Sequence, residues 1–232
     1  MANLNRIKRP TAEFSGAGMH HQAIYSAPED FTPALGPDTF FSVAPSTHGS
    51  RPFYFDAPEF GFIDQLLDIG GGAGQVASLL KHRQTRMKIT VFDLPPVCQQ
   101  ALEWFRQQGQ ADDLGAHAGN FFHDPLPSGF RAAQFAHVLE LFSPETIIGL
   151  LKKTFDALPR DGKLILYGHA CDEEKAPAKE TPWSLPAMTL FVTGAGRPHA
   201  VSQYLRWLRV VGFSRISYRH DGIRTLFLMA IK

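Results

Sequence analysis

Short runs rich in apolar residues alternate with amphipathic stretches along the middle of the chain. The runs that predict strands are residues 65–69, 87–93, 112–118, 133–139 and 163–167. Between them, apolar residues recur on one helical face, which predicts helices at 74–82, 96–108 and about 144–158. Strands that alternate with helices in this way form parallel sheets that are covered on both faces. The pattern therefore predicts an α/β fold with a doubly wound, Rossmann-like sheet.

The C-terminal part of the chain follows a different pattern. Two further helices are predicted at about 185–193 and 202–211, and two strand-like segments, 213–220 and 223–231, come after them. The dipeptide Asp221-Gly222 between these segments is a strong signal for a tight hairpin turn. Because the two strands of a hairpin run antiparallel, we expect an antiparallel strand at this end of the sheet.

The first 61 residues show no sustained helical or strand period. Their prolines are Pro10, Pro28, Pro33, Pro37, Pro45, Pro52 and Pro58. Their aromatic residues are Phe14, Tyr25, Phe31, Phe40, Phe41, Phe53, Tyr54, Phe55 and Phe60. A disordered tail is typically poor in aromatic residues. We therefore expect residues 1–61 to form an extended arm that packs its rings on the domain at 62–232, on a partner subunit or over the active site.

Three alternating glycines, Gly70, Gly72 and Gly74, follow the first predicted strand directly. Glycine allows positive φ and close backbone approach, and the helix that follows directs N–H groups and a positive dipole end toward a ligand. A dinucleotide fingerprint would need a further glycine where Gln75 stands. Asp68, two residues before the first glycine, would repel a pyrophosphate, whereas it suits the ammonium group of an amino-acid-like ligand.

A second acid, Asp93, ends the second predicted strand. An acid at this place can accept hydrogen bonds from both hydroxyls of a ribose. An amino acid and a ribose on one loop system describe S-adenosylmethionine. The residues that we predict to bind this cofactor are Asp68, Gly70, Gly72, Gly74, Asp93 and Leu94.

Four segments of the chain carry a resemblance to known proteins. They are residues 67–74 (Leu-Asp-Ile-Gly-Gly-Gly-Ala-Gly), 91–97 (Val-Phe-Asp-Leu-Pro-Pro-Val), 119–122 (Gly-Asn-Phe-Phe) and 157–166 (Ala-Leu-Pro-Arg-Asp-Gly-Lys-Leu-Ile-Leu). From about Phe60 onward the chain resembles the catalytic domain of the small-molecule O-methyltransferases of the plant caffeate and bacterial polyketide type. The resemblance implies a class I methyltransferase sheet that ends in an antiparallel hairpin. It also implies that Asn120, where the family usually has Asp, and Phe121 flank the adenine of the cofactor.

The resemblance further implies an enzyme that transfers a methyl group from S-adenosylmethionine to a small aromatic or keto-acid metabolite of specialised metabolism, by O- or C-methylation. Members of the resembled family normally carry a helical dimerisation domain before the catalytic domain, and residues 1–61 do not match it. We therefore expect a homodimer or a partner subunit to take its place. The alternative function is a subunit that binds the cofactor, does not methylate, and stabilises a catalytic partner.

The predicted methyl-transfer end departs from the resembled family. Family members commonly read Leu-His-Asp-Trp-Ser-Asp-Glu, and the His is the general base; residues 139–145 here read Leu-Glu-Leu-Phe-Ser-Pro-Glu, so Glu140 stands at its position. The two acids that usually accompany the base match Gly168 and Pro198. The apparatus that the resemblance implies is therefore altered.

Three interpretations of Glu140 remain open, and we predict Glu140 and His199 as the catalytic residues. In the first, Glu140 is the base, which requires burial to raise its pKa from about 4.3. In the second, Glu140 and His199, with His137 or His169, hold a divalent metal such as iron. In the third, Glu140 is only a polar group at a strand end. His137 alone would ordinarily be a core residue, because it falls inside a predicted strand.

Charge and composition exclude several classes of function. Lys and Arg total 23 and Asp and Glu total 22, so no positive field of the size that nucleic acids require is expected. No apolar run approaches the roughly 20 residues of a membrane helix, and the first residues lack the apolar core of a secretory signal. The two cysteines, Cys98 and Cys171, are too few for a disulfide framework. We therefore expect a cytoplasmic protein that binds a small molecule.

Overall fold

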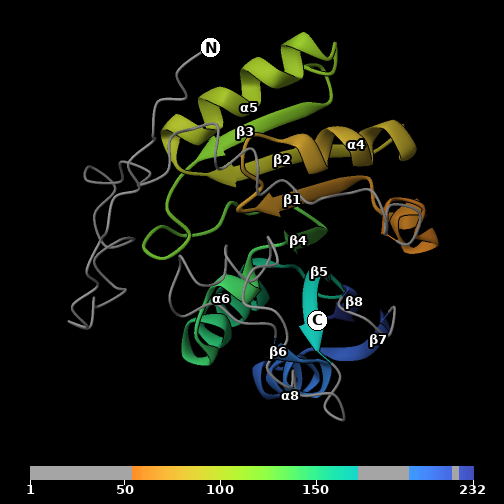
Figure 1. Cartoon of the computed structure of the whole chain (residues 1–232), viewed down its shortest axis with the longest axis vertical. Coiled ribbons are helices and arrows are strands. Elements are labelled where there is room, and N and C mark those ends of the chain that lie inside the picture. The colour runs from red at the N-terminus through yellow and green to blue at the C-terminus, as the bar shows by residue number, and fades with distance from the viewer. Residues whose placement is uncertain (1–53, 172–198, 221–224) are drawn as a thin grey trace, which may run out of the picture.

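One sheet runs through the part of the chain that the computed structural model describes, residues 54–171, 199–220 and 225–232 (Figure 1). Its strands are β1 (Gln65–Ile69), β2 (Lys88–Asp93), β3 (Leu114–Ala118), β4 (Ala132–Ala136), β5 (Lys163–Cys171), β7 (Ser214–His220) and β8 (Thr225–Ile231). They lie in the order β3-β2-β1-β4-β5-β8-β7, and β6 (His199–Ala200) pairs with β5 off this path. The strand order reverses between β1 and β4, which is where sheets of this type bind ligands.

The pairing confirms the predicted parallel sheet with an antiparallel end. The pairs β1–β2, β2–β3, β1–β4 and β4–β5 are parallel, whereas β8 runs antiparallel to both β5 and β7. The strands on either side of Asp221-Gly222 therefore pair as predicted, although that dipeptide itself lies outside the described residues. The helix predicted at 185–193 also lies outside them.

Helices cover both faces of the sheet because side chains alternate between the faces along each strand. On one face, Leu66, Ile89 and Val91 pack with α4 (Gln75–Arg83) and α5 (Pro95–Gln107). On the other face, Leu67, Phe135 and Leu166 pack with α6 (Pro144–Ala157) and α8 (Val201–Val211). Figure 1 shows these two pairs of helices beside different parts of the sheet. No helix of the described residues has the length and apolar character needed to span a membrane.

Local sequence features explain where α6 and α8 begin and end. The Ser143 side chain accepts a hydrogen bond from the backbone N–H of Thr146 at 3.4 Å, which confirms the predicted N-cap of α6. Pro144 then occupies the first turn, where a missing N–H costs nothing. Gly212 ends α8 in the left-handed conformation, with φ of 118°.

The strand predicted at 133–139 is too long. β4 ends at Ala136, because His137 has φ of 58°, and a 3-10 helix, η2 (Leu139–Leu141), follows. A left-handed residue breaks the extended backbone, so the chain turns at His137. The prediction that His137 lies inside a strand is therefore wrong.

The described end of the N-terminal arm packs into the domain. Tyr54 is fully buried, and its ring stacks on Tyr167 of β5 with centroids 4.1 Å apart. Phe60, in the 3-10 helix η1 (Pro58–Phe62), is also buried and meets Phe227 of β8 edge to face. The rings at this end of the arm therefore lie in the core. Residues 1–53 lie outside the described residues, and the boundary at 61/62 stays a prediction.

Candidate functional site

Residues 70–74, the glycine loop, connect β1 to α4 at the switch point of the sheet. Gly70, Gly72 and Gly74 have φ of 71°, 59° and 83°, a region that residues with side chains rarely adopt. A Cβ added at Gly71 would lie 2.7 Å from Oδ2 of Asp68, whereas one added at Gly72 would meet no atom within 4 Å. The loop is therefore packed tightly on its inner side and open at Gly72.

Asp93 ties the end of β2 to this loop. Its Oδ2 accepts a hydrogen bond from the backbone N–H of Gly72 at 2.9 Å, and its Oδ1 accepts one from Leu94 at 2.8 Å. Burial raises the pKa of Asp93, and these two hydrogen bonds oppose the rise. Since each carboxylate oxygen has a second lone pair, Asp93 can still accept hydrogen bonds from a ligand.

Asp68 lies beneath the loop and is fully buried. Neither of its carboxylate oxygens has a hydrogen-bond partner of ordinary geometry among the described residues. Burial raises the pKa of Asp68 to about 7; the nearby Gln134 amide opposes the rise and the Asp93 charge adds to it. Gln134, the parallel partner of Asp68 on β4, accepts a hydrogen bond from the Tyr54 hydroxyl at 2.5 Å.

Asn120 and Phe121 follow β3 in the chain. The Asn120 side-chain oxygen accepts a hydrogen bond from the backbone N–H of Phe122 at 2.9 Å, so it holds the turn. A ring carbon of Phe121 lies 3.5 Å from the place of a Cβ on Gly70. The predicted contacts of both residues with an adenine stay predictions.

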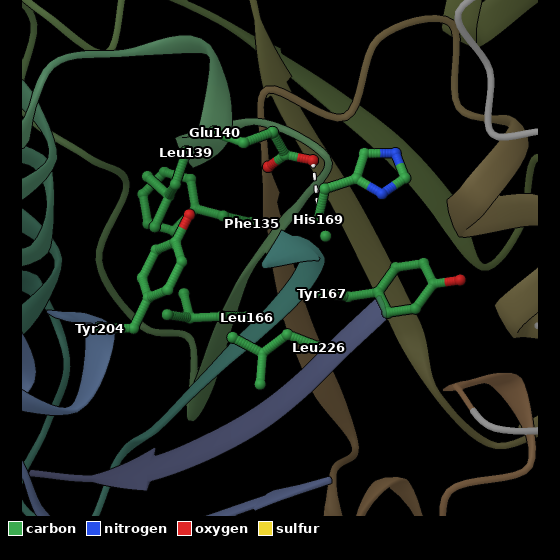
Figure 2. Close-up of a pocket in the computed structure, with 9 residues that line it drawn as sticks. Phe135, Leu139, Glu140, Leu166, Tyr167, His169, Tyr204 and Leu226 are labelled. Atoms are coloured by element: carbon green, nitrogen blue, oxygen red, sulfur yellow. Dashed lines mark hydrogen bonds between the residues drawn. The ribbon is translucent and has the colours of Figure 1, made fainter. Parts of the chain in front are cut away.

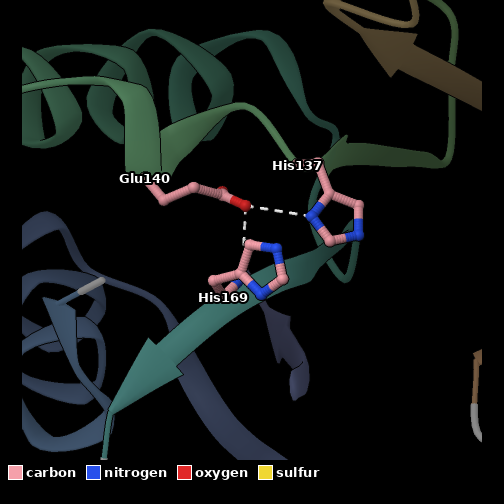
Figure 3. Close-up of side chains that lie close together, drawn as sticks. All are labelled: His137, Glu140 and His169. Carbon is pink, nitrogen blue, oxygen red and sulfur yellow. Dashed lines mark hydrogen bonds and ion pairs between the residues drawn. The ribbon is translucent and has the colours of Figure 1, made fainter. Parts of the chain in front are cut away.

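Glu140 of η2 is buried at the carboxyl ends of β4 and β5. Its Oε1 accepts a hydrogen bond from Nδ1 of His137 at 3.0 Å and one from the backbone N–H of His169 at 3.1 Å (Figure 3). Burial raises the pKa of Glu140, but the hydrogen bond from His137 and the fields of both histidines outweigh it, so the pKa lies below its ordinary value. This direction is opposite to the raised pKa that the first interpretation requires, and the assignment of Glu140 as the base stays a prediction.

Apolar side chains and Tyr204 enclose the other side of Glu140 (Figure 2). The residues that line this pocket are Phe135, Leu139, Glu140, Leu166, Tyr167, Gly168, His169, Tyr204 and Leu226. A Cβ added at Gly168 would lie 2.7 Å from Oε2 of Glu140. The Glu140 carboxylate thus fills the space beside residue 168 that a side chain there would occupy.

The structure brings Glu140 together with two histidines that differ from the predicted partner. His137, Glu140 and His169 each offer one possible ligand atom, and these atoms lie within 4.8 Å of one another. His199 is not in this group: its Nε2 lies 3.1 Å from the carbonyl oxygen of Phe142, and its ring packs on Trp207. Among the described residues, His137 and His169 are therefore the imidazoles that could share an ion with Glu140.

Sequence reasoning named His137 only as a possible additional metal ligand and did not predict its hydrogen bond to Glu140. The available signal was its spacing, since His137 stands three residues before Glu140 and the pair falls where a strand gives way to a turn. The neighbouring Val138 touches the glycine loop, because its Cγ2 would lie 2.9 Å from a Cβ on Gly70. The His137–Glu140 pair therefore lies next to the predicted cofactor site.

Comparison with known proteins gives a consistent result. The O-methyltransferase domain family matches residues 54–214. A 3-hydroxy-5-methyl-1-naphthoate 3-O-methyltransferase of Streptomyces sahachiroi is 30% identical over 154 residues, which cover 66% of this chain and 44% of that protein. The demethylspheroidene O-methyltransferase of Cereibacter sphaeroides is 31% identical over 169 residues, which cover 73% of this chain and 44% of that protein. The chain therefore spans less than half the length of either relative.

The fold is also shared with solved structures. Human N-acetylserotonin methyltransferase, in complex with S-adenosylmethionine, superposes with a TM-score of 0.74 at 22% identity. The superposition covers 91% of this chain and 58% of the human chain. At this identity the likeness establishes the fold alone, and it agrees with the predicted Rossmann-like sheet.

Proposed function

The chain belongs to the O-methyltransferase domain family, which matches it over residues 54–214, and from this membership we propose that it is an S-adenosylmethionine-dependent methyltransferase. The acceptor is a small aromatic or keto-acid metabolite, methylated on oxygen or carbon. The naphthoate acted on by the Streptomyces sahachiroi relative is of this kind. The two described cysteines are free thiols, which supports a reducing compartment such as the cytoplasm.

The glycine loop carries this proposal. Its open side at Gly72 leaves room for a ligand, and Asp93 holds the loop by its backbone. We assign the buried carboxylate of Asp68 to the cationic group of the cofactor, and Asn120 and Phe121, of which Phe121 lies near Gly70, to its adenine. When bound, the cofactor supplies a methyl group activated by a positive sulfur. The chain holds the two reactants in line, which is most of what methyl transfer requires.

Calorimetric titration with S-adenosylmethionine and S-adenosylhomocysteine tests the cofactor site. Asp93→Ala is expected to weaken the binding of both by at least about tenfold, since the ribose loses a charged acceptor and the loop loses its anchor. The matched control is Asp112→Ala, an exposed acid near the start of β3. Equal affinity in the wild type and Asp93→Ala would refute the assignment of Asp93.

The alternative, a subunit that binds the cofactor without methylating, rests on the replacement of the usual base by Glu140. Incubation with labelled cofactor and a panel of phenols, hydroxynaphthoates and arylpyruvates separates the two functions. Light scattering after size exclusion tests the proposed homodimer or partner subunit. Label transfer to any acceptor supports the enzyme, whereas tight cofactor binding with no transfer supports the alternative.

The divalent metal predicted at Glu140 and His199 stays a prediction. The geometry around Glu140 favours His137 and His169 as neighbours, and His199 Nε2 lies against a backbone carbonyl. Metal analysis of the purified protein tests it. Bound metal that is lost in both Glu140→Gln and His199→Gln supports the prediction. Absence of bound metal, with activity that chelators do not change, contradicts it.

A further inference from the structure

His137 is held in a conformation that few residues adopt. Its φ of 58° places it in the left-handed region, which is uncommon for a residue with a side chain. Its backbone N–H donates to the carbonyl oxygen of Tyr167 at 2.7 Å, so β5 fixes the turn. Such backbone outliers cluster at functional sites, where the surrounding structure maintains them. The turn directs the imidazole toward Glu140 instead of into the sheet (Figure 3).

Glu140 is fixed as firmly as the histidine that it contacts. Glu140 is only 4% exposed. Its Oε1 accepts hydrogen bonds from two N–H groups, and its Oε2 lies close to Gly168. Oε1 acts as an acceptor, because the backbone N–H of His169 that it contacts can only donate. An ionised carboxylate only accepts hydrogen bonds.

The hydrogen bond therefore determines which nitrogen of His137 carries the proton. Nδ1 must be the donor to Oε1 of Glu140, and the neutral ring then has its lone pair on Nε2. Nε2 is buried and has no hydrogen-bond partner among the described residues. A buried polar atom that is left unpaired requires an explanation, and a substrate hydroxyl is a donor that would satisfy it.

The position of His137 fits a role in the reaction. The residue directly follows β4, at the carboxyl ends of the parallel strands, where ligands bind in folds of this type. The adjacent Val138 touches Gly70 of the glycine loop. Figure 3 shows the second ring nitrogen of His137 on the side away from Glu140.

We propose that His137 is the general base of this enzyme and that Glu140 is the residue that positions it. This rests on the proposed methyltransferase function. The proton of the acceptor hydroxyl moves to Nε2 of His137, the oxygen forms its bond to the methyl carbon, and the electron pair of the broken carbon–sulfur bond stays with sulfur, which becomes a neutral thioether. The carboxylate keeps Nδ1 protonated, as in other carboxylate–histidine pairs. The proposed base thus stands three residues before the position that the base occupies in the resembled family, and Glu140 stands at that position.

The first test measures the ring itself and needs no substrate. Long-range ¹H–¹⁵N NMR correlations on the full chain, with His137 assigned from His137→Asn, are expected to show the proton on Nδ1. Glu140→Gln should abolish this preference, while Glu140→Asp should restore part of it. The proposal is overturned if the proton lies on Nε2, or if the tautomer of His137 is the same in the wild type and in Glu140→Gln.

The second test uses acceptors that differ in acidity. His137→Gln is expected to lower kcat by about 10²–10³ on a phenol of ordinary acidity, and by less than about threefold on a nitrophenol that is already ionised at the assay pH. The matched control, His82→Gln on the exposed end of α4, should leave both rates unchanged. Equal losses on both phenols would show a merely structural role and overturn the proposal.

Two further outcomes separate this proposal from its alternatives. Turnover that requires Zn²⁺ or Fe²⁺, with metal bound in the wild type and lost in His137→Gln, overturns the base in favour of a metal site. Cofactor binding without transfer to any acceptor overturns the proposed function and the base with it. Absence of cofactor binding overturns the proposed function and the base with it, whereas the NMR test can overturn the base while the proposed function stands, because it is measured without cofactor.

Discussion

The carboxyl group of Asp68 lies fully buried beneath the glycine loop, where burial raises its pKa to about 7. The groups around it are Asp93 at the end of β2, the Gln134 amide on β4, and the Tyr54 hydroxyl behind that amide. None of them supplies a positive charge. With no positive charge among these groups, the Asp68 carboxyl titrates near neutral pH.

Asp68→Asn is expected to change how stability depends on pH. The folded pKa of about 7 exceeds the unfolded value of about 3.9, so the contribution of Asp68 is fully present below pH 4 and is lost as the pH rises to 7. The Asn variant does not lose it, and should be more stable than the wild type by about 1–3 kcal/mol at pH 8, but not at pH 4. Urea unfolding at both pH values measures this, with Asp112→Asn as the exposed control. A difference that is the same at both pH values would contradict the assignment.

Gly168 is required because Glu140 fills the space beside it. Gly168→Ala would place a Cβ 2.7 Å from Oε2 of a carboxylate that cannot move freely, and should destabilise the fold by about 1–3 kcal/mol. Gly115→Ala on β3 is the control, because the nearest atom to its Cβ would lie at 3.9 Å. Thermal unfolding of both variants compares them. Equal shifts in Tm would mean that Glu140 does not occupy this space.

At the scale of elements, the glycine loop requires glycine for two reasons, which are positive φ and close packing. Gly72 needs its positive φ but has open space beside it, whereas Gly74 needs positive φ and also packs against the Phe105 ring of α5. The loop thus connects β1 to α4, packs against α5 at Gly74, and has open space at Gly72. The positive φ angles are possible because these residues are glycines, whereas the close contact at Gly74 arises from the packing of Phe105.

Alanine at these two glycines should therefore have unequal effects. Gly72→Ala is expected to cost about 1 kcal/mol of stability, from backbone strain alone. Gly74→Ala adds a collision with Phe105 and should cost about 2–4 kcal/mol. Denaturant unfolding with Gly149→Ala, whose Cβ would meet nothing within 4 Å, serves as the reference. Similar losses for Gly72 and Gly74 would show that Phe105 can move away.

At the scale of the molecule, the segment before β1 belongs to the core. Tyr54 stacks on Tyr167, packs on Phe60 and donates a hydrogen bond to Gln134 on β4. Glu59 pairs with Arg219 of β7 through both carboxylate oxygens, at 2.9 and 2.8 Å. This segment therefore connects β4, β5 and β7, which are far apart in the sequence, and should unfold together with them.

Two variants of Tyr54 test this coupling. Tyr54→Phe keeps the stacked ring but leaves Gln134 without its donor, which should cost about 1–2 kcal/mol. Tyr54→Ala also removes the ring and should cost about 3–5 kcal/mol. Unfolding followed by both near-UV and far-UV circular dichroism measures the loss. Two separate transitions, or no loss in Tyr54→Ala, would mean that the segment is not part of the cooperative core.

The sequence by itself determined the features that depend on near neighbours in the chain. Short apolar runs predict the strands, Ser143 and Pro144 predict the start of α6, and the glycines with Asp93 predict the loop. Each follows from local backbone preference or from strand ends that a parallel sheet must bring to one edge. The family resemblance rested on the same segments, and the match over residues 54–214 confirms it.

Only the tertiary structure decided which groups meet Glu140. His169 comes from another strand, and its N–H reaches Glu140 because of how β5 pairs with β4. His137 reaches it because the chain leaves β4 through a left-handed residue, which apolar periodicity does not reveal. His199, which follows the position of a family acid at Pro198, lies with its Nε2 against the Phe142 carbonyl oxygen instead. The contacts at this site depend on the register of β4 and β5 and on the backbone turn at His137. The residue types in the sequence specify neither of them.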